Sequence, residues 1–188
     1  AEACREACGL DRVWFIVAGA PPHKPANGRT HVEDRVEMAR IAIAGHAAFE
    51  VSELEARRPG PHYSVETLEQ VRQLRPEDPL FFLIGADSLV DLPMWRQPRR
   101  IAELASLVVV NRPGIDLGAG TVPDLGPNAL PIHRVDIPPI GIRSQDLRHR
   151  ISQGRSIRYQ VPRGVQAYID AKGLYQDRSG SGTAPSSP

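Results

Sequence analysis

Short, continuous runs of apolar residues alternate along this chain with segments of helical periodicity, and this alternation restricts the folds open to it. Such a run is typical of a strand that is buried on both faces, as in a parallel sheet. The sequence predicts strands at 13–17, from 49 onward, and at 80–84, 107–110 and 132–137. Helical spacing and capping signals predict helices at 31–45, from 64 onward, and at 99–105, 144–152 and 162–173. Strands separated by helices predict an α/β fold with a mostly parallel sheet flanked by helices.

Composition places the chain among ordinary globular proteins. It has 188 residues, of which 41% are hydrophobic and 24% charged, enough for one domain with a core. The 23 basic and 22 acidic residues nearly cancel, which argues against a nucleic-acid-binding protein. No apolar run approaches the roughly 20 residues that span a bilayer, so we expect no membrane partner.

The ends of the chain and the cysteines bear on processing and location. The N-terminus is charged and lacks the apolar segment of a secretory signal, and Cys4 and Cys8 are too few for a disulfide framework. Their spacing favours burial on one helix face over a metal pair, and reduced thiols are typical of the cytoplasm, where we expect the protein. We predict one domain over 1–177, in which 1–8 continue a helix already under way, and a disordered low-complexity tail over 178–188.

Ligands of parallel α/β sheets bind at the carboxyl ends of the strands, so the loops there hold the candidate site. The loop after 13–17 presents His23 and Lys24 together. A lysine at a strand end can hold a phosphate as a point charge, although a solvated loop explains the pair equally well. Arg35 lies on the following helix, where its position alone favours the surface over the site.

Two further segments follow the same logic. Ser64 opens a helix whose N–H groups can receive an anion, and plain capping explains the serine equally well. Gly85 and Asp87 follow the strand at 80–84. The glycine permits close approach of a ligand to the backbone. The carboxylate of Asp87 could bind a ribose hydroxyl or a metal, or it could cap a helix. Trp95 could cover an aromatic ligand or pack in the core.

The most strongly charged segment is 143–150. Ser144 at a helix start and Arg148 one turn later would form a phosphate cradle from a hydroxyl, N–H groups and a guanidinium. A solvated basic helix is the alternative, and clustering in a nearly neutral chain favours the anion site. The 188 residues contain no P-loop, G-x-G-x-x-G, H-E-x-x-H or G-x-S-x-G motif. The residues alone therefore predict an α/β protein that binds phosphate-bearing ligands.

Several short segments carry a more specific signal through their order and spacing over roughly residues 9–175. They are G-L-D-R-V at 9–13, P-P-H-K-P at 21–25, D-R-V-E-M at 34–38, G-P-H-Y-S at 60–64 with T-L at 67–68, I-G-A-D-S at 84–88 with Trp95, R-P-G at 112–114, D-L-R at 146–148, and 161–175. Together they resemble the bacterial nicotinate-nucleotide adenylyltransferases.

The resemblance implies a Rossmann-like nucleotidyltransferase that joins ATP to nicotinate mononucleotide, giving deamido-NAD and pyrophosphate with Mg²⁺. The mononucleotide phosphate is already an anionic nucleophile, so catalysis rests on positioning and charge neutralisation. The partners are then ATP and nicotinate mononucleotide, a homo-oligomer stays open, and no side chain is assigned to the metal. The implied residues are His23, Lys24 and Arg148 for catalysis, Arg35, Tyr63, Ser64, Thr67 and Trp95 for the substrate, and Gly85, Asp87, Ser144 and Arg148 for ATP.

Two departures from the family pattern carry expectations of their own. The family's H-x-G-H motif is absent from the 188 residues, and it would precede residue 1 together with the first strand. Because that strand lies mid-sheet in the family fold, its absence predicts apolar surface on 13–17 and 80–84, marginal stability and weak or no catalysis. The family's S-S-T-x-I-R reads R-S-Q-D-L-R here, so Arg143 and Gln145 replace two hydroxyl residues, and the arginine keeps affinity for anions.

Two alternative functions stay open. A related adenylyltransferase could use another acceptor, namely nicotinamide mononucleotide, phosphopantetheine or riboflavin phosphate. The loop at 21–24 and the helix start at Tyr63 and Ser64 favour nicotinate. A non-catalytic nucleotide-binding module that has lost its grip on the phosphates would bind ATP without releasing pyrophosphate.

Overall fold

The computed structural model describes residues 1–20, 30–111, 122–138 and 140–176. Its strands are β1 (Val13–Ile16), β2 (Phe49–Ser52), β3 (Phe81–Gly85), β4 (Ser106–Val110) and β5 (Ile132–Val135). Its helices are α1 (Glu2–Cys8), α2 (Val32–Ile43), α3 (Ser64–Leu74), α4 (Ala86–Asp91), the 3-10 helix η1 (Leu92–Met94), α5 (Pro98–Leu104), α6 (Ser144–Ser152) and α7 (Arg163–Lys172). Every element expected from the sequence is present, and α4 and η1 are additions to that expectation.

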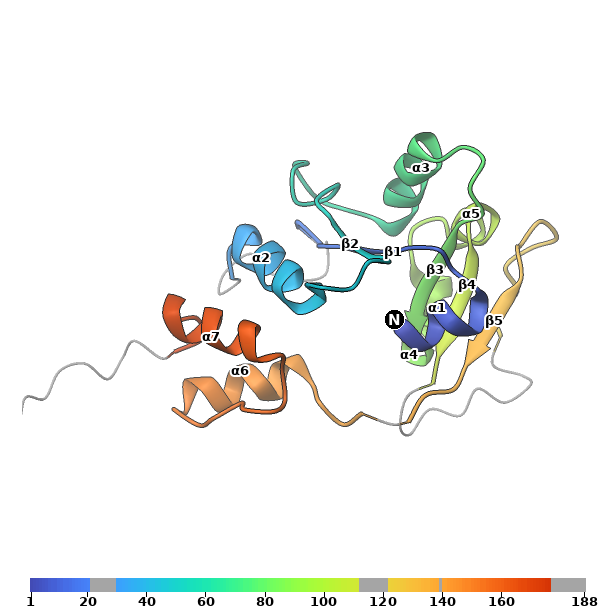
Figure 1. The fold of residues 1–188 in the computed structure, drawn as a ribbon. Helices are drawn as coiled ribbons and strands as arrows, with labels where there is room; N and C mark the ends of the chain where they lie inside the picture. The colour runs from blue at the N-terminus through green and yellow to red at the C-terminus, as the bar shows by residue number, and fades with distance from the viewer. Residues whose placement is uncertain (21–29, 112–121, 139, 177–188) are drawn as a thin grey trace, which may run out of the picture.

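The strand pairs are all parallel, but they are divided between two sheets. β1 pairs with β2, with Val13 opposite Phe49. β3, β4 and β5 form the second sheet in that order, with Phe81 opposite Ser106. Within the described residues no pairing joins β1 to β3, so the expected sheet is interrupted there (Figure 1). The α/β class with parallel strands flanked by helices is confirmed.

Local sequence accounts for the position of the helices. α3 presents Val65, Leu68 and Val71 at helical spacing on one face, and all three side chains are buried. α7 ends at Gly173, which adopts a φ of 59°, and the next N–H donates to the Ile169 carbonyl. This is the Schellman arrangement that satisfies a helix end, and it confirms the glycine as the stop.

The hydrophobic core lies around the sheet of β3, β4 and β5, which with the helices packed on it forms the three-stranded half of the molecule. Leu107, Val108 and Val109 of β4 are fully buried. Because successive side chains of a strand point to opposite faces, Leu107 and Val109 pack with α3, α4 and α5, whereas Val108 packs against Cys4 of α1. β4 is therefore buried on both faces, as its apolar run predicts. The predicted burial of Cys4 is confirmed, and Cys8 is half-buried beside it.

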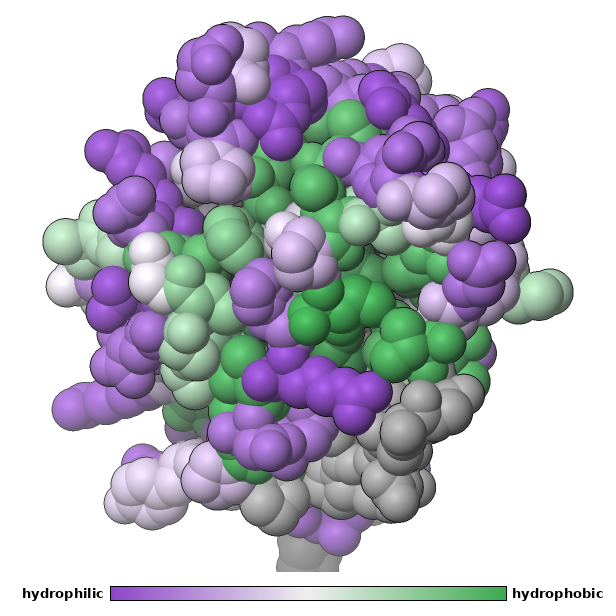
Figure 2. All heavy atoms as spheres, turned by 90° about the vertical axis from the view of Figure 1, so that its right-hand side faces the viewer, coloured by the Kyte–Doolittle hydropathy of each residue, from purple (hydrophilic) through white to green (hydrophobic). Residues whose placement is uncertain are grey.

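β1 and β3 are less buried than their sequences indicate. In β1 only Val13 is buried, and in β3 only Ile84. The prediction that 13–17 and 80–84 are buried on both faces is therefore wrong for most of their residues, which are half-buried. Both strands end a sheet, and both border a cavity. On the face drawn in Figure 2, hydrophobic residues gather between hydrophilic ones.

A separate small cluster joins α2, α6 and α7 beside the two-stranded sheet (Figure 1). Ile157, Val165 and Ile169 form its buried centre. The helices are short, and α2, the longest described, has 12 residues. Over the described ranges, no helix has both the length and the apolar character needed to cross a membrane.

Candidate active site

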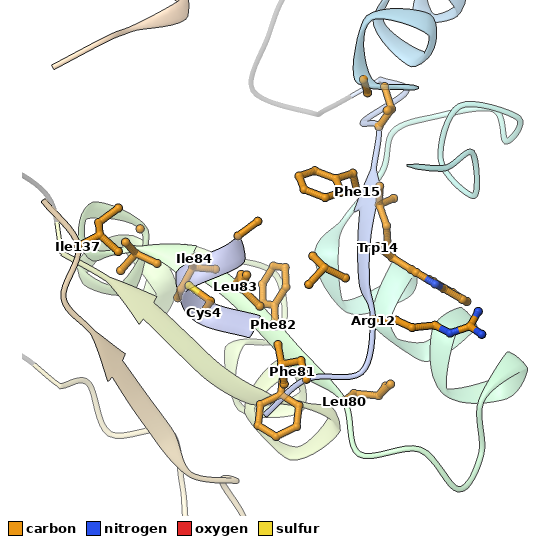
Figure 3. Close-up of a pocket in the computed structure, with 18 of the residues that line it drawn as sticks. Cys4, Arg12, Trp14, Phe15, Leu80, Phe81, Phe82, Leu83, Ile84 and Ile137 are labelled. Carbon is orange, nitrogen blue, oxygen red and sulfur yellow. The ribbon is translucent and has the colours of Figure 1, made fainter. Parts of the chain in front are cut away.

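A large cavity opens between β1 and β3. Its volume is about 1560 Å³, and 12–17 and 80–85 line it without interruption. Figure 3 shows the two strands on either side of it. At the carboxyl ends of the strands its wall includes Gly85 and Ser144, whereas the other predicted site residues of the described chain lie outside it. The candidate site therefore borders this cavity and does not fill it.

The turn that follows β1, residues 18–20, is held from α2 by Arg35. The two terminal guanidinium nitrogens donate to the carbonyls of Ala18, at 2.5 Å, and Gly19, at 3.1 Å. Its Nε is buried and has no hydrogen-bond partner. Arg35 therefore faces the carboxyl end of β1, and the surface position that its sequence context favoured is wrong. Its charge therefore lies at this strand end, with two nitrogens bonded to backbone carbonyls.

His62 belongs to this region, although sequence reasoning did not single it out. The side chain is buried, and the backbone N–H donates to the Ala20 carbonyl at 3.1 Å. A Cβ placed on Gly19 would lie 2.5 Å from Nε2, so the ring packs directly on the turn. The Arg58 guanidinium lies 3.2 Å from Nδ1, and the buried Nε2 has no hydrogen-bond partner among the described residues. The available signal was a histidine inside the segment 60–64.

The N-terminus of α3 is formed by Tyr63 and Ser64. Tyr63 is the capping residue, and no side chain caps the helix, so the capping interpretation of Ser64 is wrong. Thr67 is buried and donates to Glu55 Oε1 at 2.6 Å, which ties the helix to the loop before it. The guanidinium of Arg96 lies over the Tyr63 ring, 4.5 Å from its centroid. The helix start is thus held by contacts that leave its first N–H groups without a side-chain acceptor.

β3 ends at Gly85, opposite Val110 of β4. Gly85 is the N-cap of α4, and Asp87 lies half-buried in the first turn of that helix, where a negative charge is favourable. Trp95 packs against the core, with its ring centroid 6.2 Å from that of Phe82. The structure places Gly85 and Asp87 at a strand end, as expected, and uses at least part of the Trp95 ring in packing.

Ser144 and Arg148 lie one turn apart on α6, and both are exposed. Their spacing puts them on one face of the helix. Arg143 is the N-cap, and no side-chain hydrogen bond caps the helix. α6 has no fully buried residue, so this face is open to a ligand.

α2, which carries Arg35, is anchored to α7. The Tyr168 hydroxyl donates to Asp34 Oδ1 at 2.8 Å. This hydrogen bond to a carboxylate raises the pKa of Tyr168 above its usual value, because ionisation would remove the donor beside a negative charge. Asp34 thus positions the helix, and the next residue reaches the turn after β1.

Some predicted site residues cannot be placed. His23 and Lys24 lie outside the described residues, as does the segment 112–114. In the part of the chain that is described, no group of three or more His, Cys, Asp or Glu side chains could hold a metal.

Comparison with known proteins decides the family. A model of the cytidylyltransferase-like family matches residues 1–150. A probable nicotinate-nucleotide adenylyltransferase of Thermus thermophilus is 43% identical over 176 residues, which cover 94% of this chain and 89% of that protein. The corresponding protein of Roseiflexus sp. is 46% identical over 178 residues, covering 94% and 88%. The chain belongs to the nicotinate-nucleotide adenylyltransferase family.

Solved structures show the same fold. The Plasmodium falciparum nicotinic acid mononucleotide adenylyltransferase complexed with NaAD aligns with a TM-score of 0.71, at 16% identity, over 88% of this chain and 83% of that chain. The same enzyme complexed with APC aligns with a TM-score of 0.70, at 15% identity, over 93% and 88%. The family resemblance carried by the short segments and the Rossmann-like nucleotidyltransferase fold are thereby confirmed.

In this adenylyltransferase family member, the predicted residues fall into two described groups. Arg35 and the start of α3 meet at the turn 18–20, through the contacts of Arg35 and His62. Gly85 and Ser144 share the cavity wall at the carboxyl ends of the strands. Both groups lie at strand ends, where ligands of parallel sheets bind.

Proposed function

We propose that this chain transfers the adenylyl group of ATP to nicotinate mononucleotide, forming deamido-NAD and releasing pyrophosphate. Membership of the adenylyltransferase family supports this reaction. The structural observation that carries it is the meeting of two family segments at one strand end: Arg35 and His62 both hold the turn 18–20. In the sequence, that turn is followed directly by the segment that contains His23 and Lys24.

The chemistry needs charge neutralisation more than a strong base. An oxygen of the mononucleotide phosphate attacks the α-phosphorus of ATP, the new P–O bond forms, and the bond to the bridging oxygen of pyrophosphate breaks. Nucleophile and leaving group are both anionic, so the protein must hold them in line and offset their repulsion. Cationic side chains and helix N–H groups supply both effects.

We assign the triphosphate of ATP to α6 and the nucleoside to the end of β3. Ser144 and Arg148 present a hydroxyl and a guanidinium on one open helix face. Gly85 allows a ligand to approach the backbone, and Asp87 beside it suits a ribose hydroxyl. His23 and Lys24 would act on the reacting phosphates.

We assign the pyridine mononucleotide to the start of α3. The first N–H groups of that helix, with Ser64, suit the nicotinate carboxylate, and the half-buried rings of Tyr63 and Trp95 suit its aromatic ring. Thr67 supports this helix start through Glu55. Arg35 contributes positive charge and holds the turn after β1.

Mg²⁺ fits this reaction as an ion carried by the substrate. It keeps several of its waters and is usually bound through substrate phosphates with few protein carboxylates. When bound, the ion would neutralise charge on the triphosphate. We place the reaction in the cytoplasm, where the free thiols of Cys4 and Cys8 stay reduced.

Pyrophosphate release with different acceptors tests the proposal. The chain is incubated with ATP, Mg²⁺ and, separately, nicotinate mononucleotide, nicotinamide mononucleotide, phosphopantetheine and riboflavin phosphate. We expect the fastest release with nicotinate mononucleotide. Preference for another acceptor would replace the substrate assignment. Calorimetric binding of ATP without pyrophosphate release from any acceptor would contradict catalysis and favour a nucleotide-binding module.

A matched pair of arginine variants tests the ATP assignment. Arg148→Ala removes the guanidinium from the open face of α6, and Arg158→Ala removes another exposed arginine nearby in the chain. We expect Arg148→Ala to lower kcat/KM for ATP by about 100-fold, the scale of one charged transition-state contact, and Arg158→Ala to change it little. Equal effects of the two variants would remove Arg148 from the site.

A further inference from the structure

Arg96 connects the segment before α5 with the start of α3. Its guanidinium lies over the Tyr63 ring, with the central carbon 4.5 Å from the ring centroid. A terminal nitrogen lies 3.6 Å from Oε1 of Glu66 in the first turn of α3, which makes an ion pair but is too long for a hydrogen bond. Over the described ranges, no residue accepts a hydrogen bond from this guanidinium, and the side chain is 51% exposed. Its donors therefore lie beside the helix start and remain available to a ligand.

The backbone is fixed on both sides of Arg96. Trp95 packs against the hydrophobic core, and its N–H donates to the Leu92 carbonyl at 3.0 Å. Gln97 adopts a left-handed φ of 52° as the N-cap of α5, and Pro98 begins that helix. A left-handed conformation is uncommon for residues other than glycine, and it persists where the surrounding structure holds it. A defined turn therefore places Arg96 against α3.

Basic groups outnumber acidic ones around the start of α3. Glu66 is shared by two arginines, since Nη2 of Arg58 lies 3.8 Å from its Oε2 and Arg96 lies near its Oε1. Glu55, hydrogen-bonded to the first turn of α3, adds a negative charge, and Arg35 at the turn 18–20 adds a positive one. Three guanidinium groups thus meet two carboxylates, and the dipole of α3 contributes further positive charge.

Nicotinate and nicotinamide mononucleotides differ in one group, a carboxylate in the first and a carboxamide of nearly the same shape in the second. The N–H groups at a helix start can donate to an oxygen of either group, so by themselves they discriminate weakly. A guanidinium has five donors and no acceptor. It pairs with both oxygens of a carboxylate, but it meets the NH₂ of a carboxamide donor to donor. A guanidinium at this position therefore favours the acid and disfavours the amide.

We infer that Arg96 is a specificity-determining residue, whose guanidinium selects the carboxylate of nicotinate mononucleotide over the carboxamide of nicotinamide mononucleotide. The inference rests on the proposed function, which places the pyridine ring at the start of α3 beside Tyr63 and Trp95. The pyridinium charge, the ribose and the phosphate are common to both mononucleotides. Their interactions with the protein cancel in the ratio of the two affinities, so this ratio isolates the effect of the carboxylate.

Calorimetric titration with each mononucleotide tests the inference without the need for turnover. Arg96→Gln keeps a polar side chain and removes the charge. We expect it to weaken the binding of nicotinate mononucleotide by about tenfold, the scale of one charged hydrogen bond, and to change that of nicotinamide mononucleotide by less than about twofold. Salt at about 1 M shortens the screening length to about 3 Å, so the preference of the parent for the acid should shrink, and that of Arg96→Gln should change less.

Two further variants separate selectivity from folding. Arg100 on α5, which packs against α3 (Figure 1), is exposed to a similar extent and pairs with Glu69 of α3 at 3.3 Å, more than one turn beyond the helix start. Arg100→Gln removes one positive charge between the same two segments, and we expect it to leave the ratio of affinities unchanged. Arg96→Lys keeps the charge without the guanidinium fork, and it should recover part of the preference for the acid.

The two affinities separate the outcomes. A ratio that falls in Arg96→Gln, recovers in part in Arg96→Lys and is unchanged in Arg100→Gln supports the inference. Equal weakening of both mononucleotides would assign Arg96 to the phosphate or to packing, and it overturns the inference. An unchanged ratio in Arg96→Gln overturns it too, as does a parent that binds both mononucleotides equally or neither.

Pyrophosphate release, measured separately with the parent, tells failure of this inference from failure of the proposed function. If the parent releases pyrophosphate with nicotinate mononucleotide and Arg96→Gln keeps the preference for the acid, the reaction stands and the inference falls. If the parent releases none while Arg96 still sets the ratio of affinities, the reaction falls and the inference stands.

Discussion

The three-stranded half and the two-stranded half of this molecule are held together by different forces. The largest fully buried side chains among the described residues, including Leu107, Leu89 and Ile101, all lie on β4 or on the helices packed against the three-stranded sheet. The two-stranded half has the smaller cluster of α2, α6 and α7 and a set of directed polar contacts. Apolar burial supplies stability in proportion to area, whereas hydrogen bonds fix geometry and add about 0.5–1.5 kcal/mol each.

The hydrogen bonds of the two-stranded half position backbone close to the candidate site. In the two-stranded half, Arg35 holds the turn after β1 and Tyr168 holds the helix that carries Arg35. At this turn, which follows the end of β1, the two segments at 34–38 and 60–64 that carry the family resemblance meet. In the part of the molecule with the weaker core, the turn at this strand end is therefore positioned by specific hydrogen bonds.

Truncation of one core side chain in each half gives the largest expected effect. Leu107→Ala in β4 removes a fully buried side chain, and it should lower the free energy of unfolding by about 2–5 kcal/mol. Ile16→Ala in β1 removes a half-buried one, and it should cost about 1 kcal/mol because less apolar area leaves contact. Urea denaturation measures both. Equal losses would break the contrast between the halves.

A methyl group at the turn after β1 should have the next largest effect. Gly19→Ala places a Cβ against the Glu55 carbonyl and 2.5 Å from Nε2 of His62. Backbone or the buried ring must move, at a cost of about 1–3 kcal/mol. Gly141→Ala is the control, because nothing lies within 4 Å of the added Cβ, and it should change stability by less than about 0.5 kcal/mol. A neutral Gly19→Ala would show that the turn is loosely packed.

Replacement of Arg35 tests whether its hydrogen bonds position the turn after β1. Arg35→Ala removes both donors from the carbonyls of Ala18 and Gly19, and it should lower stability by about 1–2 kcal/mol. Arg35→Lys should recover part of the loss, since a single ammonium does not reproduce the guanidinium fork. Arg40 lies on the same helix as Arg35 and forms an exposed ion pair with Glu53. Arg40→Ala removes this ion pair, and it should cost less than about 1 kcal/mol. Equal costs for Arg35→Ala and Arg40→Ala would contradict the positioning role.

The smallest expected effect is a pH dependence at the contact between α2 and α7. The pKa of Tyr168 is raised by its hydrogen bond to Asp34. A raised folded-state pKa means that this contribution is fully present below the unfolded-state value of about 10 and is lost as pH rises through the folded-state value. Urea midpoints from about pH 8 to 11 should fall more steeply for the parent than for Tyr168→Phe. Tyr159→Phe, at a 92% exposed site, should follow the parent curve. Parallel curves for the parent and Tyr168→Phe would show that the bond does not stabilise α2.

The strands show how much of the burial of a strand can be predicted from an apolar run. The runs at 13–17, 80–84 and 107–110 look alike, and all three form parallel strands. Only the last is buried on both faces, because α3, α4 and α5 pack on one face of β4 and α1 packs on the other, whereas β1 and β3 border the cavity. A run of apolar residues shows which side chains can be buried, and the elements packed on each face decide which of them are buried.

The candidate site shows the same limit at the level of side chains. The positions of Gly85, Asp87 and Ser144 at strand and helix ends followed from the sequence. The contacts of Arg35 and of His62 with the turn 18–20 did not, because this turn is more than 10 residues from Arg35 and more than 40 from His62 along the chain. Local spacing does not specify such partners.

The sequence by itself determined the kinds of elements, their parallel α/β order and the family to which the chain belongs. These depend on local periodicity and on short segments that can be read without coordinates. Only the tertiary structure decided that the strands divide into two sheets, that a cavity with open backbone edges lies between β1 and β3, and that Arg35 holds the turn after β1. Those features arise from contacts between distant parts of the chain, which are selected by the packing of the whole molecule.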